Sequence, residues 1–347
     1  MNTRSNRYEI RILLDSHSKI TINKSIPYLG GKSYTDDFQI KHNEILLICR
    51  RSAIIELRDI FHNNNSSLNN QIIKSLLYYY GLTSSLCRIA SIIVKRFGSK
   101  NVLDKKSLEN EDIQQIFLTN KTLAYKINPT QLDIILDETP KSHSLRNSLS
   151  HYFTGYVKDK SYEKFEKYWK SFNAIYKSIT GIQQDKGALI NLRAFSVARS
   201  NNMFFSNEIS KALKDKEIQK LSIRSFISKD FPTNSNTVDF IRFVKRYTDH
   251  RILGSIKNRD YGIQKDFMTS QQSADLDSHI SANTSSKSNI ELTFFLTGKF
   301  GYAIRNQIFH AEKIDNEFRI SKTKSVKDIE LVNRVFSAYI IDLFNLS

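Results

Sequence analysis

Apolar and polar positions alternate near the start of the chain. In "RYEIRILLD" (7–15) and "KITI" (19–22) the side chains switch between apolar and polar along the chain, as they do in half-buried strands. "YLGGKSYTDD" then indicates a turn. Its "GGKS" is not a phosphate-binding loop, because Ile26 stands where that loop needs its first glycine. We therefore predict an N-terminal extension, residues 1–44, that contains short strands.

From residue 45 the apolar positions recur every three or four residues. This helical spacing runs through "EILLICRRSAIIELRDIFHN" (44–63) and then through "QIIKSLLYYYGLTSSLCRIASIIVKRF" (71–97). The second run is apolar on several faces, which is typical of a helix buried between neighbours. Residues 45–158, which close on "SHSLRNSLSHYFTGY", are predicted to form a first helical domain.

A second helical domain is predicted over residues 159–347. Its opening helix, in "KSYEKFEKYWKSFNAIYKSITG", has its aromatic residues at helical spacing and ends at Gly181. Further helices follow, and the polar, Ser-rich stretch 269–289 is predicted to be a connecting loop. An apolar helix that carries the second motif and an amphipathic last helix complete the chain. The predicted fold class is thus mostly α.

Composition adds a partner and a compartment to this picture. The formal net charge of +17 favours a polyanionic partner, and nucleic acid is the commonest one; otherwise the basic residues only solvate the surface. Cys49 and Cys87 lie in apolar surroundings, which favours buried free thiols in a reducing compartment. With no secretory signal and no apolar run long enough for a membrane span, we expect a cytoplasmic protein.

One pattern occurs twice: an Arg, an Asn directly after it, and a His four residues beyond the Asn. On a helix the Asn and His share a face, since residues four apart lie about 40° apart around the axis. The Arg lies about 140° from the His, so it reaches the His only through its length or at a bend. The candidate site residues are Arg146, Asn147 and His151, and Arg305, Asn306 and His310.

These three side chains suit the cleavage of RNA, whose 2′-hydroxyl is a built-in nucleophile. The His can act as general base or acid near neutral pH, the Arg can bind the phosphate, and the Asn can orient the His. Two facing motifs would supply both a base and an acid, with no metal or cofactor. The other His residues lack the pattern and are predicted to be surface or structural groups: His17, His42, His62, His143, His250 and His279. His143 lies close enough to the first motif to be a candidate to assist it, but a structural role is favoured.

The chain resembles the HEPN superfamily, helical domains marked by an R-x4–6-H arrangement with a polar residue, often Asn, after the Arg. The likeness is best over 160–347, in "YEKFEKYWKSFNAIYKSITG", "AIRNQIFHAEK" and "IELVNRVFSAYIIDLF". The first half has "LRNSLSHYF" and "SLLYYYGLTSSL", and it is weakly similar to YaaC-like proteins. Residues 1–44 match no family that we know.

The resemblance implies two helical bundles packed as a pseudo-dimer within one chain, with the two motifs forming one composite site. It also implies a metal-independent endoribonuclease that leaves a 2′,3′-cyclic phosphate and a 5′-hydroxyl, as a toxic effector in anti-phage defence or a toxin–antitoxin-like system. An inhibitory or activating protein partner is expected with such an enzyme. The weaker first half leaves open a decayed first motif, or a homodimer in which two C-terminal domains pair.

Two other functions stay open. The chain can be a non-catalytic helical module that binds RNA or a partner protein, and the charge does not distinguish this from an enzyme. A metal-dependent nuclease or nucleotidyltransferase would need clustered carboxylates, for which "DLD" (275–277) is a weak candidate. The repeated Arg, Asn and His favour the ribonuclease.

Overall fold

The computed structural model describes residues 6–16, 18–29, 34–63, 66–98, 101–109, 111–223, 227, 230–231, 236–259, 261–309 and 324–347. The chain forms two compact units, one of residues 1–157 with Ser347 and one of residues 158–346. We call them the N-terminal unit and the C-terminal unit.

The N-terminal unit is built on an antiparallel six-stranded sheet with the strand order β2-β3-β4-β1-β6-β7. The central strand β1 pairs on both sides, so that Ile10 lies opposite both Leu47 and Val94. The strands expected near the start of the chain are present as β1 and β2. The strands are β1 (Asn6–Leu14), β2 (Thr21–Pro27), β3 (Thr35–Lys41), β4 (Glu44–Arg51), β6 (Ile89–Phe97) and β7 (Val102–Glu109).

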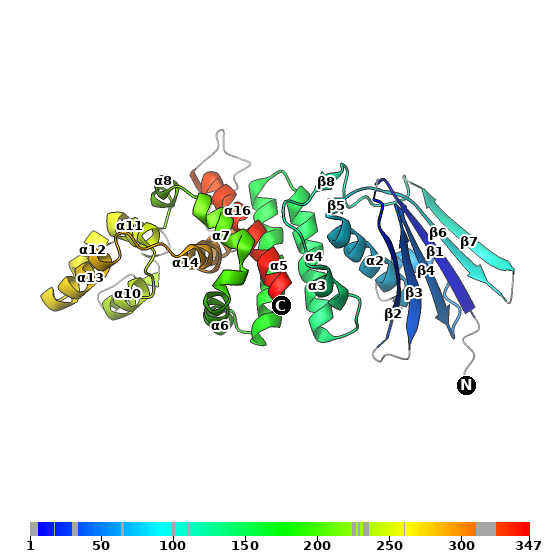
Figure 1. Ribbon diagram of the computed structural model, residues 1–347, viewed down its shortest axis with the longest axis horizontal. Coiled ribbons are helices and arrows are strands. Elements are labelled where there is room, and N and C mark those ends of the chain that lie inside the picture. Colours follow the sequence, from blue (N-terminus) through cyan, green and yellow to red (C-terminus); the bar gives the residue numbers. More distant parts are fainter. Residues whose placement is uncertain are drawn as a thin grey trace. The chain divides into compact units, whose positions relative to one another are not determined.

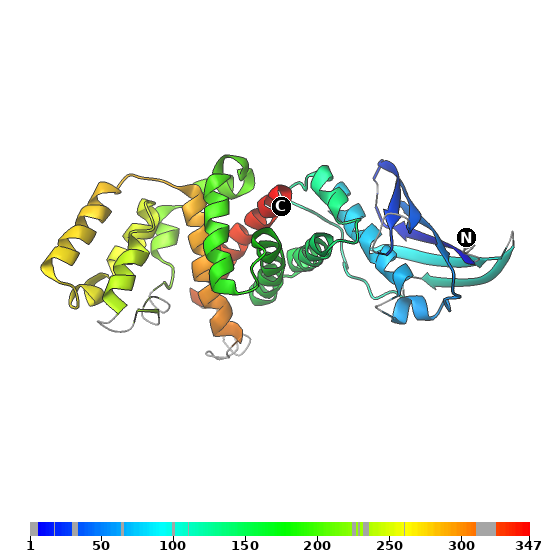
Figure 2. The same cartoon turned by 90° about the horizontal axis from the view of Figure 1, so that it is seen from below.

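One face of this sheet packs against the helix α2 (Ser67–Thr83), as Figures 1 and 2 both show. Every second side chain of β1 is buried, and three consecutive tyrosines of α2, Tyr78, Tyr79 and Tyr80, are at most 2% exposed. The remaining elements of the unit are α1 (Asp59–His62), β5 (Ser85–Leu86), β8 (Lys121–Thr122), α3 (Pro129–Ile134) and α4 (Pro140–Val157).

The prediction of a mostly helical chain was wrong, because the N-terminal unit combines a sheet with helices. Residues 44–51, predicted as helix, form β4, where burial alternates from residue to residue. The long helix predicted over 71–97 stops at Thr83, since Ser84 adopts a left-handed conformation with φ 53°. After the two-residue strand β5 the chain enters β6, whose Ile and Val side chains favour a strand. The two halves are therefore not similar helical bundles.

The C-terminal unit consists of helices throughout its described part. Its polar stretch 269–289 was predicted as a loop, but it contains α13, which starts with reciprocal hydrogen bonds between Thr269 and Gln272. The helices are α5 (Ser161–Thr180), α6 (Asp185–Ala198), η1 (Ser200–Asn202), α7 (Phe204–Ala212), α8 (Asp215–Gln219), α10 (Thr237–Val244), α11 (His250–Arg259), α12 (Tyr261–Lys265), α13 (Ser270–Ala282), α14 (Asn289–Phe294), the π-helical turn η3 (Phe295–Phe300), α15 (Gly301–Phe309) and α16 (Lys324–Leu346).

The core of the C-terminal unit lies between α5 and α16. The aromatic stripe of α5 predicted from the sequence is buried here, and Phe172 meets Phe336 of α16 with 5.3 Å between ring centroids. The helix ends where predicted, because Gly181 has φ 68° and its N–H donates to the carbonyl oxygen of Lys177. The helix α15, which carries the second motif, packs against both of these helices.

Candidate active site

The first motif lies on α4, and its arginine is directed to the backbone. Arg146 Nη1 donates to the carbonyl oxygens of Ile135 at 2.7 Å and of Asp137 at 2.6 Å. These carbonyls follow the end of α3, where backbone acceptors lack helical partners. Arg146 thus supplies hydrogen bonds to backbone carbonyls of the residues that join α3 to α4.

The remaining contacts of Arg146 form a buried ionic cluster in the N-terminal unit. Its Nη2 lies 3.4 Å from Glu138 Oε2, and Glu138 Oε1 lies 2.7 Å from Lys74 Nζ. Burial lowers the pKa of Arg146, against the opposing charge of Glu138. Burial also lowers the pKa of Lys74, which donates to the carbonyl oxygens of Pro27 and Leu136. Each charge is therefore paired and hydrogen-bonded, as buried charges need to be.

The histidine that contacts Arg146 is His143. Arg146 Nη2 donates to His143 Nδ1 at 2.8 Å, and His143 Nε2 lies 3.2 Å from Glu138 Oε2. An accepting Nδ1 places the ring proton on Nε2, facing the carboxylate. Burial and the charge of Arg146 both lower the pKa of His143, which favours this neutral form. The cluster thus orders His143, which was predicted to be structural.

The other two residues of the first motif lie apart from this cluster. Asn147 is exposed, whereas Arg146 is buried, so the two side chains leave α4 on different sides. His151 is half-buried on the same helix. The first motif is therefore divided: its Arg belongs to the α3–α4 connection, and its Asn faces outward.

The second motif lies on α15 and has a different geometry. Arg305 Nη1 donates to Asn306 Oδ1 at 2.9 Å, and both side chains are half-buried. The guanidinium of Arg305 thus points around the helix toward the side of Asn306. The sequence alone did not determine this direction. His310 lies outside the described residues.

Two glycines leave room for aromatic rings, Gly298 for one in its own helical segment and Gly301 for one of α16. A Cβ atom at Gly298 would lie 2.8 Å from the ring of Phe294, and one at Gly301 would lie 3.1 Å from the ring of Phe336. Gly298 stands within the π-helical turn η3 that precedes α15. Such turns often occur at functional sites. Here the turn sets the orientation of the helix that carries Arg305.

A group of polar side chains at the end of α5 and the start of α6 lies near the second motif. The hydroxyl of Tyr176 donates to Asp185 Oδ1 at 2.8 Å, and Lys177 Nζ lies 3.1 Å from the same oxygen. Burial, followed by the Asp185 carboxylate, raises the pKa of Tyr176, and the charge of Arg305 opposes this shift. Arg305 therefore lies within electrostatic reach of the end of α5.

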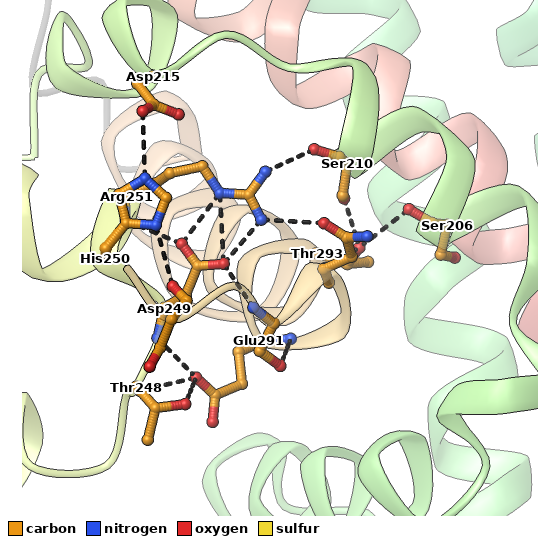
Figure 3. A network of polar contacts seen from close by, with 12 residues as sticks. Ser206, Ser210, Asp215, Thr248, Asp249, His250, Arg251, Glu291 and Thr293 are labelled. Carbon is orange, nitrogen blue, oxygen red and sulfur yellow. Dashed lines mark hydrogen bonds and ion pairs between the residues drawn. The ribbon is translucent and has the colours of Figure 1, made fainter. Parts of the chain in front are cut away.

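A second polar network, which the sequence did not predict, lies between α7, α11 and α14 (Figure 3). Asp249 and Arg251 are almost fully buried and pair at 2.7 Å. Arg251 also donates to the carbonyl oxygen of Ser210 and to Asn289, and Asp249 accepts from the backbone N–H of Ser288. Because every charged group here has several partners, the network holds these helices together.

Two histidines, His250 and His279, make hydrogen-bond contacts beside this network. The ring nitrogens of His250 lie 2.9 Å from the carbonyl oxygen of Ser286 and 3.1 Å from Asp215 Oδ2. His279 Nε2 lies 2.9 Å from the carbonyl oxygen of Tyr247. Both were predicted to be surface or structural groups, and both bridge elements of the C-terminal unit.

In the described ranges, no group of three or more His, Cys, Asp or Glu side chains is arranged to hold a metal ion. Among the helices that are described, none combines the length and apolar composition needed to cross a membrane. No family model, no curated protein and no solved structure matches this chain.

Proposed function

We propose that the chain is a metal-independent endoribonuclease whose catalytic groups are Arg305, Asn306 and His310. It leaves a 2′,3′-cyclic phosphate and a 5′-hydroxyl, and it acts in the cytoplasm as a toxic effector in anti-phage defence or a toxin–antitoxin-like system. A protein partner that inhibits or activates it belongs to this proposal.

The observation that carries the proposal is the hydrogen bond between Arg305 and Asn306. Helical geometry alone places the Arg about 140° from the His five residues later. The 2.9 Å contact with Asn306 Oδ1 brings the guanidinium toward the face that Asn306 occupies. This is the face on which helical spacing would place residue 310. A phosphate binder, an amide and an imidazole would then act from one side of a helix.

The reaction then proceeds by transfer to the neighbouring hydroxyl. His310 takes the proton of the 2′-hydroxyl, the 2′-oxygen attacks phosphorus, and the bond from phosphorus to the 5′-oxygen breaks. Arg305 binds the phosphate oxygens, where negative charge gathers. A separate group, acting as general acid, protonates the leaving 5′-oxygen. The sequence offers His151 for this step, or His310 of a second copy of the chain.

The test incubates the purified protein with single-stranded RNA in the presence of EDTA and identifies the ends of the products. We expect cyclic phosphates and 5′-hydroxyls, and a loss of about 10²–10⁴-fold in rate for His310→Ala. His62→Ala is the matched control, because His62 is exposed and lies outside both motifs. Loss of activity in His151→Ala would identify His151 as the acid. Intact RNA with the wild type, or equal cleavage by His310→Ala, contradicts the proposal.

A binding module is the second candidate, and the placement of Arg146 favours it. An arginine that serves two backbone carbonyls is not available to a phosphate. If the wild type binds RNA tightly but leaves it intact, the chain is a non-catalytic RNA-binding module. Growth after induction separates the two in cells, because only the nuclease stops growth with fragmented RNA.

A further inference from the structure

The helix that carries the second motif contains a half-buried lysine, Lys299, in its π-helical turn. Burial lowers the pKa of Lys299, and the charges of Arg246, Lys186 and Arg193 lower it further, against an opposing effect of Asp230. The packing agrees with this: the Arg193 guanidinium lies 5.6 Å from the ring centroid of Tyr247, and that ring lies 5.5 Å from the ring of Phe295, in the same turn as Lys299. In the sequence, the visible signal of this position is a lone lysine within the apolar "FFLTGKFGYAI".

These cations come from three separate parts of the unit. Lys186 and Arg193 lie seven residues apart on α6, and thus on one side of that helix. Arg246 follows the end of α10, and Lys299 comes from η3. Bringing like charges together costs free energy unless an anion lies among them. Two carboxylates, Asp230 and Glu291, oppose these four cations, so the cluster keeps a net positive charge that favours a negatively charged ligand.

Arg193 is held in position by its neighbours. Its Nη2 donates to the carbonyl oxygen of Arg246 and lies 3.6 Å from Glu291 Oε1, and its guanidinium lies 5.6 Å from the ring centroid of Tyr247. Its Nε is buried and has no hydrogen-bond partner in the part of the chain that the structure describes. A guanidinium ordered in this way loses little further freedom when it binds a ligand.

The nearby carboxylate of Glu291 does not neutralise the cluster by itself. Its Oε2 accepts from the backbone N–H groups of Thr248 at 2.8 Å and of Asp249 at 3.2 Å. Only its Oε1 faces Arg193. The side chains of Lys186 and Arg246 are both exposed, so they can reach a ligand from solvent.

The register of the motif helix relates this cluster to the second motif. Asn306 follows Lys299 by seven residues, close to two helical turns, of which the first part belongs to the π-helical turn and the rest to α15. Lys299 and Asn306 therefore lie on the same side of the helix. An extended ligand that contacts one can continue to the other.

We propose that Lys186, Arg193, Arg246 and Lys299 form a phosphate-binding patch that holds the RNA backbone beside the phosphate cleaved at the second motif. This inference rests on the proposed function and adds the path of the substrate to it. Contacts to backbone phosphates position a nucleic acid without reading its sequence. We therefore expect the patch to contribute equally to RNAs of different sequence.

The test measures binding of fluorescent single-stranded RNA, and of DNA of the same sequence, by anisotropy over about 50–200 mM salt. DNA lacks the 2′-hydroxyl, so it reports binding without cleavage. Lys299→Gln and the double variant K186Q/R246Q are expected to bind several-fold more weakly. The slope of log K against log salt should become shallower by about 0.7 for each phosphate that a variant no longer neutralises.

The matched control is the double variant K211Q/K216Q, which removes two exposed positive charges from α7 and α8 of the same unit. Binding by the patch variants that equals binding by this control overturns the inference. Both residues of K186Q/R246Q are exposed, and the carbonyl that Arg193 uses is kept. That variant therefore decides the question even if Lys299→Gln fails to fold.

Failure of this inference and failure of the proposed function give different results. If the wild type cleaves RNA while the patch variants bind and cleave as the control does, only the patch is wrong. If no protein cleaves RNA but the patch variants still lose affinity and salt dependence, the patch stands and the nuclease proposal fails.

Discussion

The same Arg-Asn pair has opposite surroundings in the two units. In the N-terminal unit Arg146 is buried and donates to the carbonyl oxygens of Ile135 and Asp137. In the C-terminal unit Arg305 is half-buried and donates to the adjacent Asn306. One guanidinium stabilises a connection between two helices, and the other is held beside the amide of its own motif. Equal spacing therefore does not give equal contacts.

The elements before each motif explain the difference. A short connection from α3 leads into α4, and it leaves backbone carbonyls within reach of Arg146. Before α15 the chain is continuous helix through the π-turn η3, so its backbone carbonyls have helical partners. Arg146 thus finds strong acceptors nearby, whereas Arg305 finds a side chain.

The largest expected effect separates the two arginines by activity. Arg305→Gln should lower the rate of RNA cleavage by about 10²–10³-fold, as loss of one group that stabilises transition-state charge does. The measurement is single-turnover cleavage with saturating protein. Arg242→Gln, an exposed arginine on α10, is the control and should cleave normally. A normal cleavage rate for Arg305→Gln would contradict the catalytic role proposed for Arg305.

The next effect separates them by stability. Arg146→Ala should lower the free energy of unfolding by about 3 kcal/mol, because it leaves two carbonyls without this donor and removes one of the cationic partners of Glu138. Asn147→Ala, at the exposed neighbouring position, should change it by less than about 0.5 kcal/mol. Urea unfolding followed by circular dichroism gives both values. Equal effects would show that Arg146 is not the anchor that its contacts indicate.

A pH effect of intermediate size is expected in the C-terminal unit. Burial raises the pKa of Asp342 to about 6 from 3.8, although Ser206 donates to it. Between these values the folded state holds a proton that the unfolded state has released. The free energy of unfolding therefore falls as the pH rises through this window, by about 1 kcal/mol from pH 5 to 7. Asp342→Asn should abolish this change in unfolding measured at both pH values.

The smallest effect compares two glycines that have open space around them. Gly181 has φ 68°, and nothing lies within 4 Å of an added Cβ there or at Gly254 within α11. Gly181→Ala should lower the free energy of unfolding by about 1 kcal/mol, because alanine disfavours this conformation. Gly254→Ala should raise it by up to about 1 kcal/mol. Shifts of the same sign would rule out backbone conformation as the cause.

Where local signals agreed, the sequence sufficed to predict the elements. The aromatic stripe of α5 and its stop at Gly181 are both visible in the sequence, and α5 is found as predicted. The alternation in β1 correctly predicted a strand with one buried face. In these elements hydrophobic periodicity and the end signal indicate one structure, so no distant contact is needed to choose it.

The sheet of the N-terminal unit was decided by tertiary contacts. "EILLICRR" fits either period over so short a length, and its pairing with β1 and β3 makes it a strand. The two motifs show the same limit at the level of single side chains. The sequence identified Arg146 and Arg305 as equivalent, but it contained no information on which acceptor each would meet. Only the packing of residues distant in sequence placed carbonyls beside one guanidinium and gathered Lys299 with Arg193 and Arg246, because hydrogen bonds and charge interactions depend on distance in space.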